Sequence, residues 1–397
     1  NHLAVISLVT QDEQKVYGKG QLAILNTQTG VVEETVTVGH FPYAVQWLNQ
    51  KLYLTVLGEN KLAIYNAKLK PLKTIAVGKT PQTLCNDNSR LYVVNTASDN
   101  LSVIDTKKDE LIGTVAVAYQ NFHAGSSPTS CVVQGNRLYV TQAELNAVAV
   151  LDNETWQKLG LVPTGWYPTK VLFDDQQMIA VSAKGIRTRR PNVDSSQPTD
   201  KQGTNFEYVL ALLKGSVSLI PQTEIEANLS KWTQQVEEGS PLYSVRDGIK
   251  LPIRHIFYII KENRTYDQVL GDLSRGNGDP KLTLFGRDVT PNHHQIAEQF
   301  VTLDNFYANG EISVLGHSFT TSGYASPFLE WLGNARYSGR YNSYPFGIVP
   351  ATFSPTYLWN ALEAKQVDYR IYGEPYYIFT RAYQVIIDTY GSDSELA

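Results

Sequence analysis

Residues 91–117 read LYVVNTASDNLSVIDTKKDELIGTVAV, and this stretch decides the fold of the amino-terminal part of the chain. Its runs of Val, Ile, Leu and Tyr are separated by polar turns, which is the pattern of short β-strands. The same plan recurs as LYLTVLGENKLAIYNAKLKPLKTIAV at residues 52–77 and as LYVTQAELNAVAVLDNETWQKLGLV at residues 138–162. Each unit contains a strand, a turn, a second strand that ends in Asn or Asp, another turn and a third strand.

A Gly-x-x-Pro-like element opens the successive units, with its proline at Pro42, Pro81, Pro128 and Pro168. The repeat period of about 40 residues, with short strands inside it, predicts a β-propeller whose blades have about four strands each. Solenoids of helix pairs have similar periods, but these units alternate by two and are rich in β-branched residues. One characteristic strand per unit predicts about five blades: residues 21–26, 61–66, 101–105, 147–152 and 216–220.

The repeat also resembles a known family. Residues 92–117 are similar to the YVTN-type propeller repeat of bacterial, often periplasmic, surface-layer-like proteins, a family in which about seven blades are the norm. The resemblance implies a YVTN-like β-propeller over residues 1–221. Ile225, Leu229, Trp232 and Val236 then follow helical spacing, which predicts a helical linker over residues 222–250.

The composition is that of a soluble globular protein, with 42% hydrophobic and 18% charged residues among 397. A net charge of −4 gives no electrostatic footprint for nucleic acid, and no apolar run has the ~20 residues of a membrane span. The single methionine is Met178, so we expect Asn1 to follow a removed signal peptide or an artificial cut.

The chain has two cysteines, Cys85 and Cys131, which follow Pro81 and Pro128 at similar offsets in successive repeats. Equivalent sites on neighbouring repeats are usually too far apart to be bridged. We therefore expect two buried thiols and no disulfide.

The sequence changes character after Leu251, where single strands begin to alternate with helices. Apolar runs predict strands at 253–260, 300–306 and 368–372, and helices are predicted at 265–272, 291–300 and 357–365. This alternation predicts an α/β sheet. Glu262 and Asn263 come directly after the first of these strands, and their oxygens suit a hard cation. The alternative is an ordinary strand followed by a charged helix cap.

Three segments of this region resemble the phosphoesterase family. They are HIFYIIKENRTYDQVLGDLSRGNGDP at 255–280, LFGRDVTPNHHQIAEQFVTLDNFYANGEIS at 284–313 and YLWNALEAKQVDYRIYGE at 357–374. The family contains bacterial phospholipase C and acid phosphatase enzymes and belongs to the alkaline phosphatase superfamily. The chain is most similar to two-domain proteins that join a YVTN-type propeller to such a domain, which implies an α/β phosphoesterase-like domain over residues 251–397.

The resemblance also implies a site. Glu262 and Asn263 match the family's pair of ligands for a catalytic divalent metal, which could be Ca²⁺, Mg²⁺, Mn²⁺ or Zn²⁺. Ser313, in NGEISVLGH, matches the nucleophile, and Gly310 and Gly316 are expected to let the backbone turn around it. His317 is a candidate for phosphate contact or proton donation, with a structural loop histidine as the alternative.

Arg264 is a candidate for binding the phosphate, and an ion pair with Asp267 is its alternative role. Two departures from the family pattern stand out. Leu315 occupies a position where relatives usually have Asp, and the downstream aspartates and histidines that complete the metal site have no counterpart before Ala397. Asp388 and Asp393 lie in different surroundings and are not assigned to that site.

The resemblance implies a metal-dependent phosphoesterase in the periplasm or secreted from the cell, without a transmembrane segment. Its substrate would be a small-molecule or lipid phosphate ester, and its propeller would bind a protein or cell-wall partner. The alternative is a non-catalytic propeller binding protein that carries a degenerate or truncated phosphatase-like domain.

Overall fold

A computed structural model describes residues 2–7, 19–117, 125–186, 213–239, 252–304, 306–323, 325, 329–330 and 357–373. The chain divides into two compact units, residues 1–245 together with 310–397 (unit 1) and residues 246–309 (unit 2). Each unit is described by itself.

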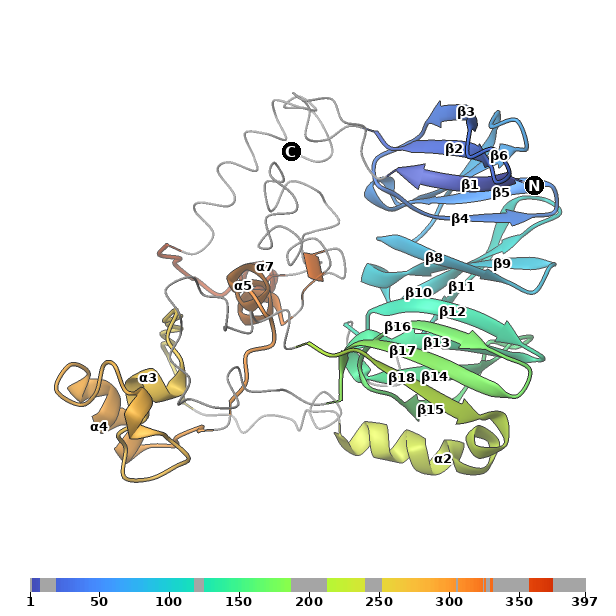
Figure 1. The fold of residues 1–397 in the computed structure, drawn as a ribbon. Coiled ribbons are helices and arrows are strands. Elements are labelled where there is room, and N and C mark those ends of the chain that lie inside the picture. The colour runs from blue at the N-terminus through green and yellow to red at the C-terminus, as the bar shows by residue number, and fades with distance from the viewer. Residues whose placement is uncertain are drawn as a thin grey trace. The chain divides into compact units, whose positions relative to one another are not determined.

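Unit 1 contains five antiparallel sheets, in each of which the strands are neighbours in chain order (Figure 1). The first sheet has β1 (His2–Ser7), β2 (Gln21–Asn26) and β3 (Val32–Thr37). The second has β4 (Pro42–Leu48), β5 (Lys51–Val56), β6 (Lys61–Asn66) and β7 (Pro71–Ala76). The third has β8 (Pro81–Asn86), β9 (Arg90–Asn95), β10 (Asn100–Asp105) and β11 (Glu110–Ala116). The fourth has β12 (Pro128–Gln134), β13 (Arg137–Gln142), β14 (Ala147–Asp152) and β15 (Lys158–Pro163), and the fifth has β16 (Trp166–Phe173), β17 (Gln177–Gly185) and β18 (Ser216–Pro221).

The repeat seen in the sequence sets the connections inside these sheets. A short 3₁₀ turn joins the second strand to the third in the second, third and fourth sheets: η1 (Leu57–Glu59), η2 (Thr96–Ser98) and η3 (Ala143–Leu145). Each turn ends in a left-handed residue, Asn60, Asp99 or Asn146, with φ of 53°, 49° and 51°. Asn and Asp tolerate this conformation better than other residues with a Cβ, so the repeat places them there.

Consecutive sheets pack face to face through shared apolar clusters. Leu22 of the first sheet is buried with Leu54 of the second, and Ile64 of the second with Val93 of the third. Further clusters join the third sheet to the fourth and the fourth to the fifth. The opening strands β4, β8, β12 and β16 contact one another in succession. Antiparallel sheets that pack on one another in succession are consistent with the blades of a β-propeller, so the coarse prediction of a multi-blade β fold with about five sheets is confirmed.

A Leu-Tyr step near the start of the second strand in the second, third and fourth sheets supplies a contact to the next blade. The Tyr53 hydroxyl donates a hydrogen bond to Asp109 Oδ1 of the third sheet at 2.7 Å. The Tyr92 hydroxyl donates to Asn153 Oδ1 of the fourth sheet at 2.9 Å. The ring of Tyr139 packs on Phe173 of the fifth sheet with centroids 4.6 Å apart. One repeat position therefore supplies the contact from each blade to the next.

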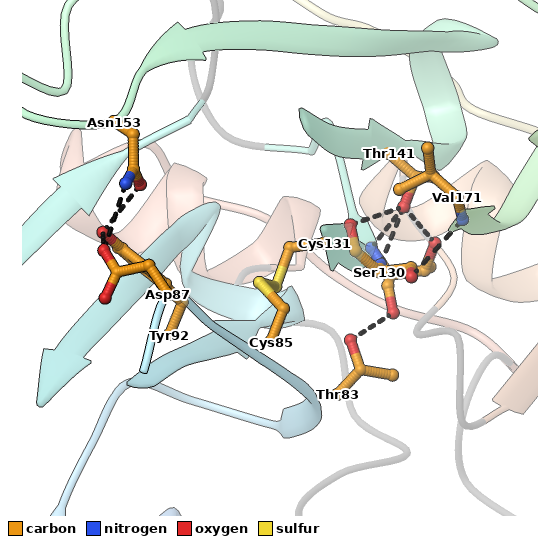
Figure 2. Close-up of a disulfide and its surroundings, with 10 residues drawn as sticks. Thr83, Cys85, Asp87, Tyr92, Ser130, Cys131, Thr141, Asn153 and Val171 are labelled. Carbon is orange, nitrogen blue, oxygen red and sulfur yellow. Dashed lines mark hydrogen bonds between the residues drawn. A yellow bond between two sulfur atoms is a disulfide. The ribbon is translucent and has the colours of Figure 1, made fainter. Parts of the chain in front are cut away.

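The two cysteines correct the sequence analysis. Cys85 of β8 and Cys131 of β12 form a disulfide, with their Cα atoms 5.7 Å apart, so the prediction of two free thiols was wrong (Figure 2). The reason lies in the propeller, because its opening strands are neighbours and equivalent positions on them come within bridging distance. The bond is buried in the cluster between the third and fourth sheets.

The predicted helix after the propeller is confirmed as α2 (Gln222–Gly239). It packs on β15, where the Leu161 amide donates a hydrogen bond to Thr233 Oγ1 at 2.8 Å. A Cβ on Gly160 would lie 2.5 Å from the same oxygen, so glycine permits the close approach. The helix thus covers the outer edge strand of the fourth sheet. In the described part of the chain, no helix has the length and apolarity to cross a membrane.

Unit 2 contains α3 (Tyr266–Leu270) and α4 (Pro291–Gln299), which agree with the predicted helices, and the short 3₁₀ helix η5 (Pro280–Leu282), which was not predicted. The predicted strand at 253–260 does not form, and the described residues of 300–306 form none either. In the carboxyl-terminal part of unit 1, α7 (Leu358–Ala364) is present as predicted, while 368–372 is not a strand.

The apolar run at 253–260 shows why these predictions were wrong. Ile256 and Phe257 are 81% and 88% exposed, so the run has no described sheet to join. An apolar alternating sequence favours extended backbone, but a strand needs a hydrogen-bonded neighbour. The α/β sheet therefore remains a prediction that the described residues do not provide.

Candidate functional site

Ser313 is the first residue of α5 (Ser313–Ser322) in unit 1, and its side chain is half-buried. The turn before it depends on Gly310, because a Cβ there would lie 2.3 Å from the Leu315 Cβ. The role expected of Gly310 agrees with this geometry. Gly316 lies inside the helix with open space around it, so its expected role in the turn was wrong.

His317 follows Ser313 by one helical turn, and residues spaced i, i+4 are neighbours on a helix surface. Its side chain is half-buried. Leu315, where relatives usually have an acidic residue, is fully buried in a small cluster with Ile312 and Leu329. Leu315 therefore serves the core of this segment, while Ser313 and His317 are the polar groups on its first turns.

The other predicted site residues lie in unit 2. Glu262, Asn263 and Arg264 are all exposed. The Arg264 guanidinium lies 5.0 Å from the ring centroid of Phe285, and this cation–π contact takes the place of the suggested pair with Asp267. Asp267 instead accepts a hydrogen bond from the Asp279 amide at 2.8 Å.

The described residues do not form a metal site by themselves. Among them, no group of three or more His, Cys, Asp or Glu side chains is placed to hold a metal ion. Glu262 and Asn263 offer two exposed oxygen ligands, whereas Ca²⁺ and Mg²⁺ in proteins take about six or more ligands in all and Zn²⁺ takes about four. Asp388 and Asp393 lie outside the described residues.

Unit 2 also contains a buried histidine that the sequence analysis did not assign. His294 Nε2 lies 2.7 Å from Asp272 Oδ1, and its Nδ1 lies 2.8 Å from the Thr290 carbonyl oxygen. Burial opposes a charge on the ring, but these two acceptors outweigh it and hold the pKa of His294 above its ordinary value. Both ring nitrogens face acceptors, so His294 has a structural role and its nitrogens are already engaged within unit 2.

A second group that the sequence analysis missed surrounds Lys184 near the end of β17. Its Nζ lies 3.0 Å from Glu311 Oε1 and 3.0 Å from Glu330 Oε2. The same atom lies 5.0 Å from the ring centroid of Trp166 and 5.2 Å from that of Tyr167. All three charged side chains are only 6% exposed. We call these five residues the Lys184 cluster.

The strand register shows where this cluster lies in the repeat. In the second to the fifth blade, the opening proline pairs with a residue of the second strand: Pro42 with Val56, Pro81 with Asn95, Pro128 with Gln142 and Pro168 with Ser182. The second residue after that partner is in turn Gly58, Ala97, Glu144 and Lys184. A position held by a small residue in two blades thus carries an acidic residue and a basic residue in the last two.

The electrostatics of the cluster favour a bound proton. Burial would lower the pKa of Lys184, but Glu330 and Glu311 outweigh it and hold that pKa above its ordinary value. Burial raises the pKa of Glu330. Burial, together with the charge of Glu330, also raises the pKa of Glu144 to about 8, and Glu144 Oε1 has no hydrogen-bond partner among the described residues. Glu144, outside the five residues of the Lys184 cluster, thus adds a third carboxyl group to the electrostatics around this ammonium, and its pKa of about 8 favours the protonated form at neutral pH.

Glu144→Gln is expected to stabilise the protein increasingly as the pH rises. The folded-state pKa of Glu144 is about 8, above the 4.5 of a free carboxyl. Its contribution to the free energy of unfolding is therefore fully present below pH 4.5 and is lost as the pH rises toward 8. Glutamine is neutral throughout. Urea unfolding of parent and variant at several pH values should show equal stability in acid and a growing advantage for the variant up to about pH 8.

Glu59→Gln is the matched control with the opposite sign. A hydrogen bond with the His40 side chain is the main cause that lowers the pKa of Glu59 to about 2. Glu59 therefore contributes stability above its ordinary pKa, and this is lost as the pH falls toward 2. Its glutamine variant should be less stable than the parent at neutral pH. A pH-independent difference for Glu144→Gln would contradict the proton assigned to the cluster.

No protein-family model matches the sequence, and no curated protein matches it. Hydrazine synthase of Kuenenia stuttgartiensis is similar to 38% of this chain, with 21% identity, a TM-score of 0.33 and 44% of its own chain covered. Dihydro-heme d1 dehydrogenase NirN in complex with DHE is similar to 41% of this chain, with 13% identity, a TM-score of 0.35 and 37% of its own chain covered. The chain thus spans less than half of either structure.

Proposed function

We propose that the protein is a metal-dependent phosphoesterase that uses Ser313 as its nucleophile. The observation that supports this most is the position of Ser313 as the first residue of α5, directly after the close turn at Gly310. Amide N–H groups and the helix dipole at such a position favour an anionic group. This adds to the resemblance of residues 255–280, 284–313 and 357–374 to the phosphoesterase family.

The side chains of α5 have defined parts in this reaction. The Ser313 Oγ attacks phosphorus and its proton passes to solvent water, while the bond from phosphorus to the leaving oxygen breaks. In this proposal a protonated His317, one turn along, donates its own proton to the leaving oxygen. Water then attacks the phosphoserine and releases phosphate or a phosphomonoester, which restores the serine. A divalent cation would supply charge stabilisation when bound, and Glu262 and Asn263 are the residues proposed to contact it, with further ligands outside the described residues.

The disulfide supports a location outside the cytoplasm. Structural disulfides form and persist in oxidising compartments, among them the bacterial periplasm, and Cys85–Cys131 is buried between two blades. We therefore propose a periplasmic or secreted protein. The substrate class in this proposal is a small-molecule or lipid phosphate ester, and a protein or cell-wall component is the proposed partner of the propeller.

A non-catalytic binding protein is the second candidate. It is favoured by the metal-ligand set, because Glu262 and Asn263 are exposed and the described residues bring no cluster of three ligands together. In this case the propeller binds the partner and the carboxyl-terminal region is a scaffold without turnover.

Turnover with and without a chelator separates the two candidates. We expect the full chain to hydrolyse p-nitrophenyl phosphate or bis(p-nitrophenyl) phosphate and to lose this activity in EDTA, because the proposed cation stabilises charge on the phosphoryl oxygens. Activity should return when Mg²⁺, Mn²⁺, Ca²⁺ or Zn²⁺ is added back. A folded protein that is inert with every one of these ions would favour the binding protein.

A further inference from the structure

The partners of Lys184 flank the helix that carries Ser313. Glu311 precedes Ser313 by two residues, and Glu330 follows the end of α5. Lys184 itself belongs to the fifth sheet and is 127 positions from Glu311 in the sequence. One buried ammonium thus holds both ends of a segment that is remote along the chain.

The segment also has a small apolar cluster of its own. Its own apolar cluster consists of Ile312, Leu315, Ala325 and Leu329, with Phe319 packed against them. Four buried side chains, one of them alanine, give a small area of apolar contact against the entropy of ordering some twenty residues. These contacts bring Glu311 and Glu330 together within the segment. The ion pairs with Lys184 then join that segment to the propeller.

The geometry around Lys184 suits a fixed connection. Two carboxylates and the Trp166 and Tyr167 rings surround the ammonium, so both its charge and its direction are constrained. Removing one partner of a buried ion pair leaves an uncompensated charge, which is strongly destabilising. Loss of the ammonium would leave Glu311 and Glu330 facing each other, with Glu144 nearby.

We infer that Lys184 is a positioning residue, through which the fifth blade of the propeller fixes α5 and with it Ser313. The inference rests on the proposed function only where it names Ser313 as the nucleophile. In this role the last blade is a structural part of the site, in addition to any partner that the propeller binds. Glu144 accompanies Lys184 at the equivalent repeat position of the preceding blade.

Hydrogen exchange of the full chain tests the inference without requiring activity. In Lys184→Met, which keeps the apolar stem and removes the charge, amides of residues 311–323 should exchange on the order of 10-fold faster or more. Amides of the second and third sheets should keep their protection. Lys184→Arg should restore protection of α5, because it keeps a cation at the same place.

Lys51→Met is the matched control. Lys51 Nζ lies 2.6 Å from Asp109 Oδ2 and joins the second and third sheets, so its loss should speed exchange there and leave α5 unchanged. Glu311→Gln provides a second route if Lys184→Met fails to fold, because it removes one carboxylate and keeps the cation. Unchanged exchange of α5 in both Lys184→Met and Glu311→Gln would overturn the inference.

Kinetics give a readout that a merely stabilising role would not change. Where the parent turns over a phosphate ester, Lys184→Met should lower kcat at least about 10-fold with little change in KM, because the nucleophile is displaced while substrate contacts remain. Equal kcat in parent and variant, with α5 exchange faster, would overturn the positioning of Ser313. A parent without turnover would refute the proposed function, and the hydrogen-exchange experiment would still test whether Lys184 holds α5.

Discussion

Replacing Ser313 with alanine is expected to lower kcat for a phosphate ester about 1,000-fold or more. Its Oγ is the atom proposed to form the bond to phosphorus, and alanine has no oxygen that could replace it at the first position of α5. Alanine is a good helix former, so the helix should remain. The measurement is steady-state turnover of p-nitrophenyl phosphate, combined with mass spectrometry of the parent for a phosphoryl group on Ser313 after rapid quenching.

Ser318→Ala is the control for this prediction. Ser318 lies on the same helix, five residues on, and is also half-buried. The substitution removes an identical hydroxyl from α5, so any general effect of losing a serine from this helix should appear in both variants. We expect near-parental turnover for Ser318→Ala. If Ser313→Ala turned over the substrate as fast as Ser318→Ala and the parent, Ser313 would be excluded as the nucleophile.

Opening the Cys85–Cys131 disulfide is expected to lower the free energy of unfolding by about 4 kcal/mol. The bond closes a loop with a sequence separation of 46, so in the chain-entropy description it removes many conformations from the unfolded state. It also joins two neighbouring blades at their opening strands. Urea unfolding of the parent and of the Cys85→Ala/Cys131→Ala double variant would measure the difference.

The reductant dependence provides the control. The parent should lose stability when dithiothreitol is added, whereas the double variant should unfold at the same urea concentration with and without it. Each single alanine variant should resemble the double variant, because one remaining cysteine cannot form the bridge. A parent whose unfolding midpoint does not respond to reductant would show that the disulfide contributes nothing to stability.

The repeat made the propeller predictable. The second, third and fourth blades carry the same local signals, namely a proline at the opening strand, a Leu-Tyr step and a polar residue at the turn. The characteristic strands at residues 21–26, 61–66 and 147–152 have the predicted bounds.

Contacts between blades were harder to predict, because repeat spacing along the chain does not give distance in space. Cys85 and Cys131 are 46 positions apart and yet bonded, since the opening strands of neighbouring blades adjoin. The sequence does contain a signal for Lys184, but only a comparison of the repeats shows it. When Gly58, Ala97, Glu144 and Lys184 are aligned at one repeat position, two small residues are followed by two ionisable ones.

In the carboxyl-terminal region, the helices could be predicted from the sequence and the strands could not. Helices α4 and α7 depend on local signals, such as Pro291 at the start of α4, and were predicted correctly. The strands were not, because the run at 253–260 needs partners that local sequence does not supply. Local sequence likewise gives no contacts for Ser313, so Ser313 was assigned by resemblance. The ion pair between Lys184 and Glu311, two residues before Ser313, is visible only in the folded chain.

The disulfide also determines how the propeller would carry mechanical load. A pulling force applied at the two ends of the chain would pass from β8 to β12 directly through the sulfur atoms of Cys85 and Cys131. The residues between them, including β9, β10 and β11, would stay slack while the covalent bond holds. Once that bond is broken, unfolding of the residues between the cysteines would release about 150 Å of contour length. The third blade is thus protected from tension that the blades before it must bear.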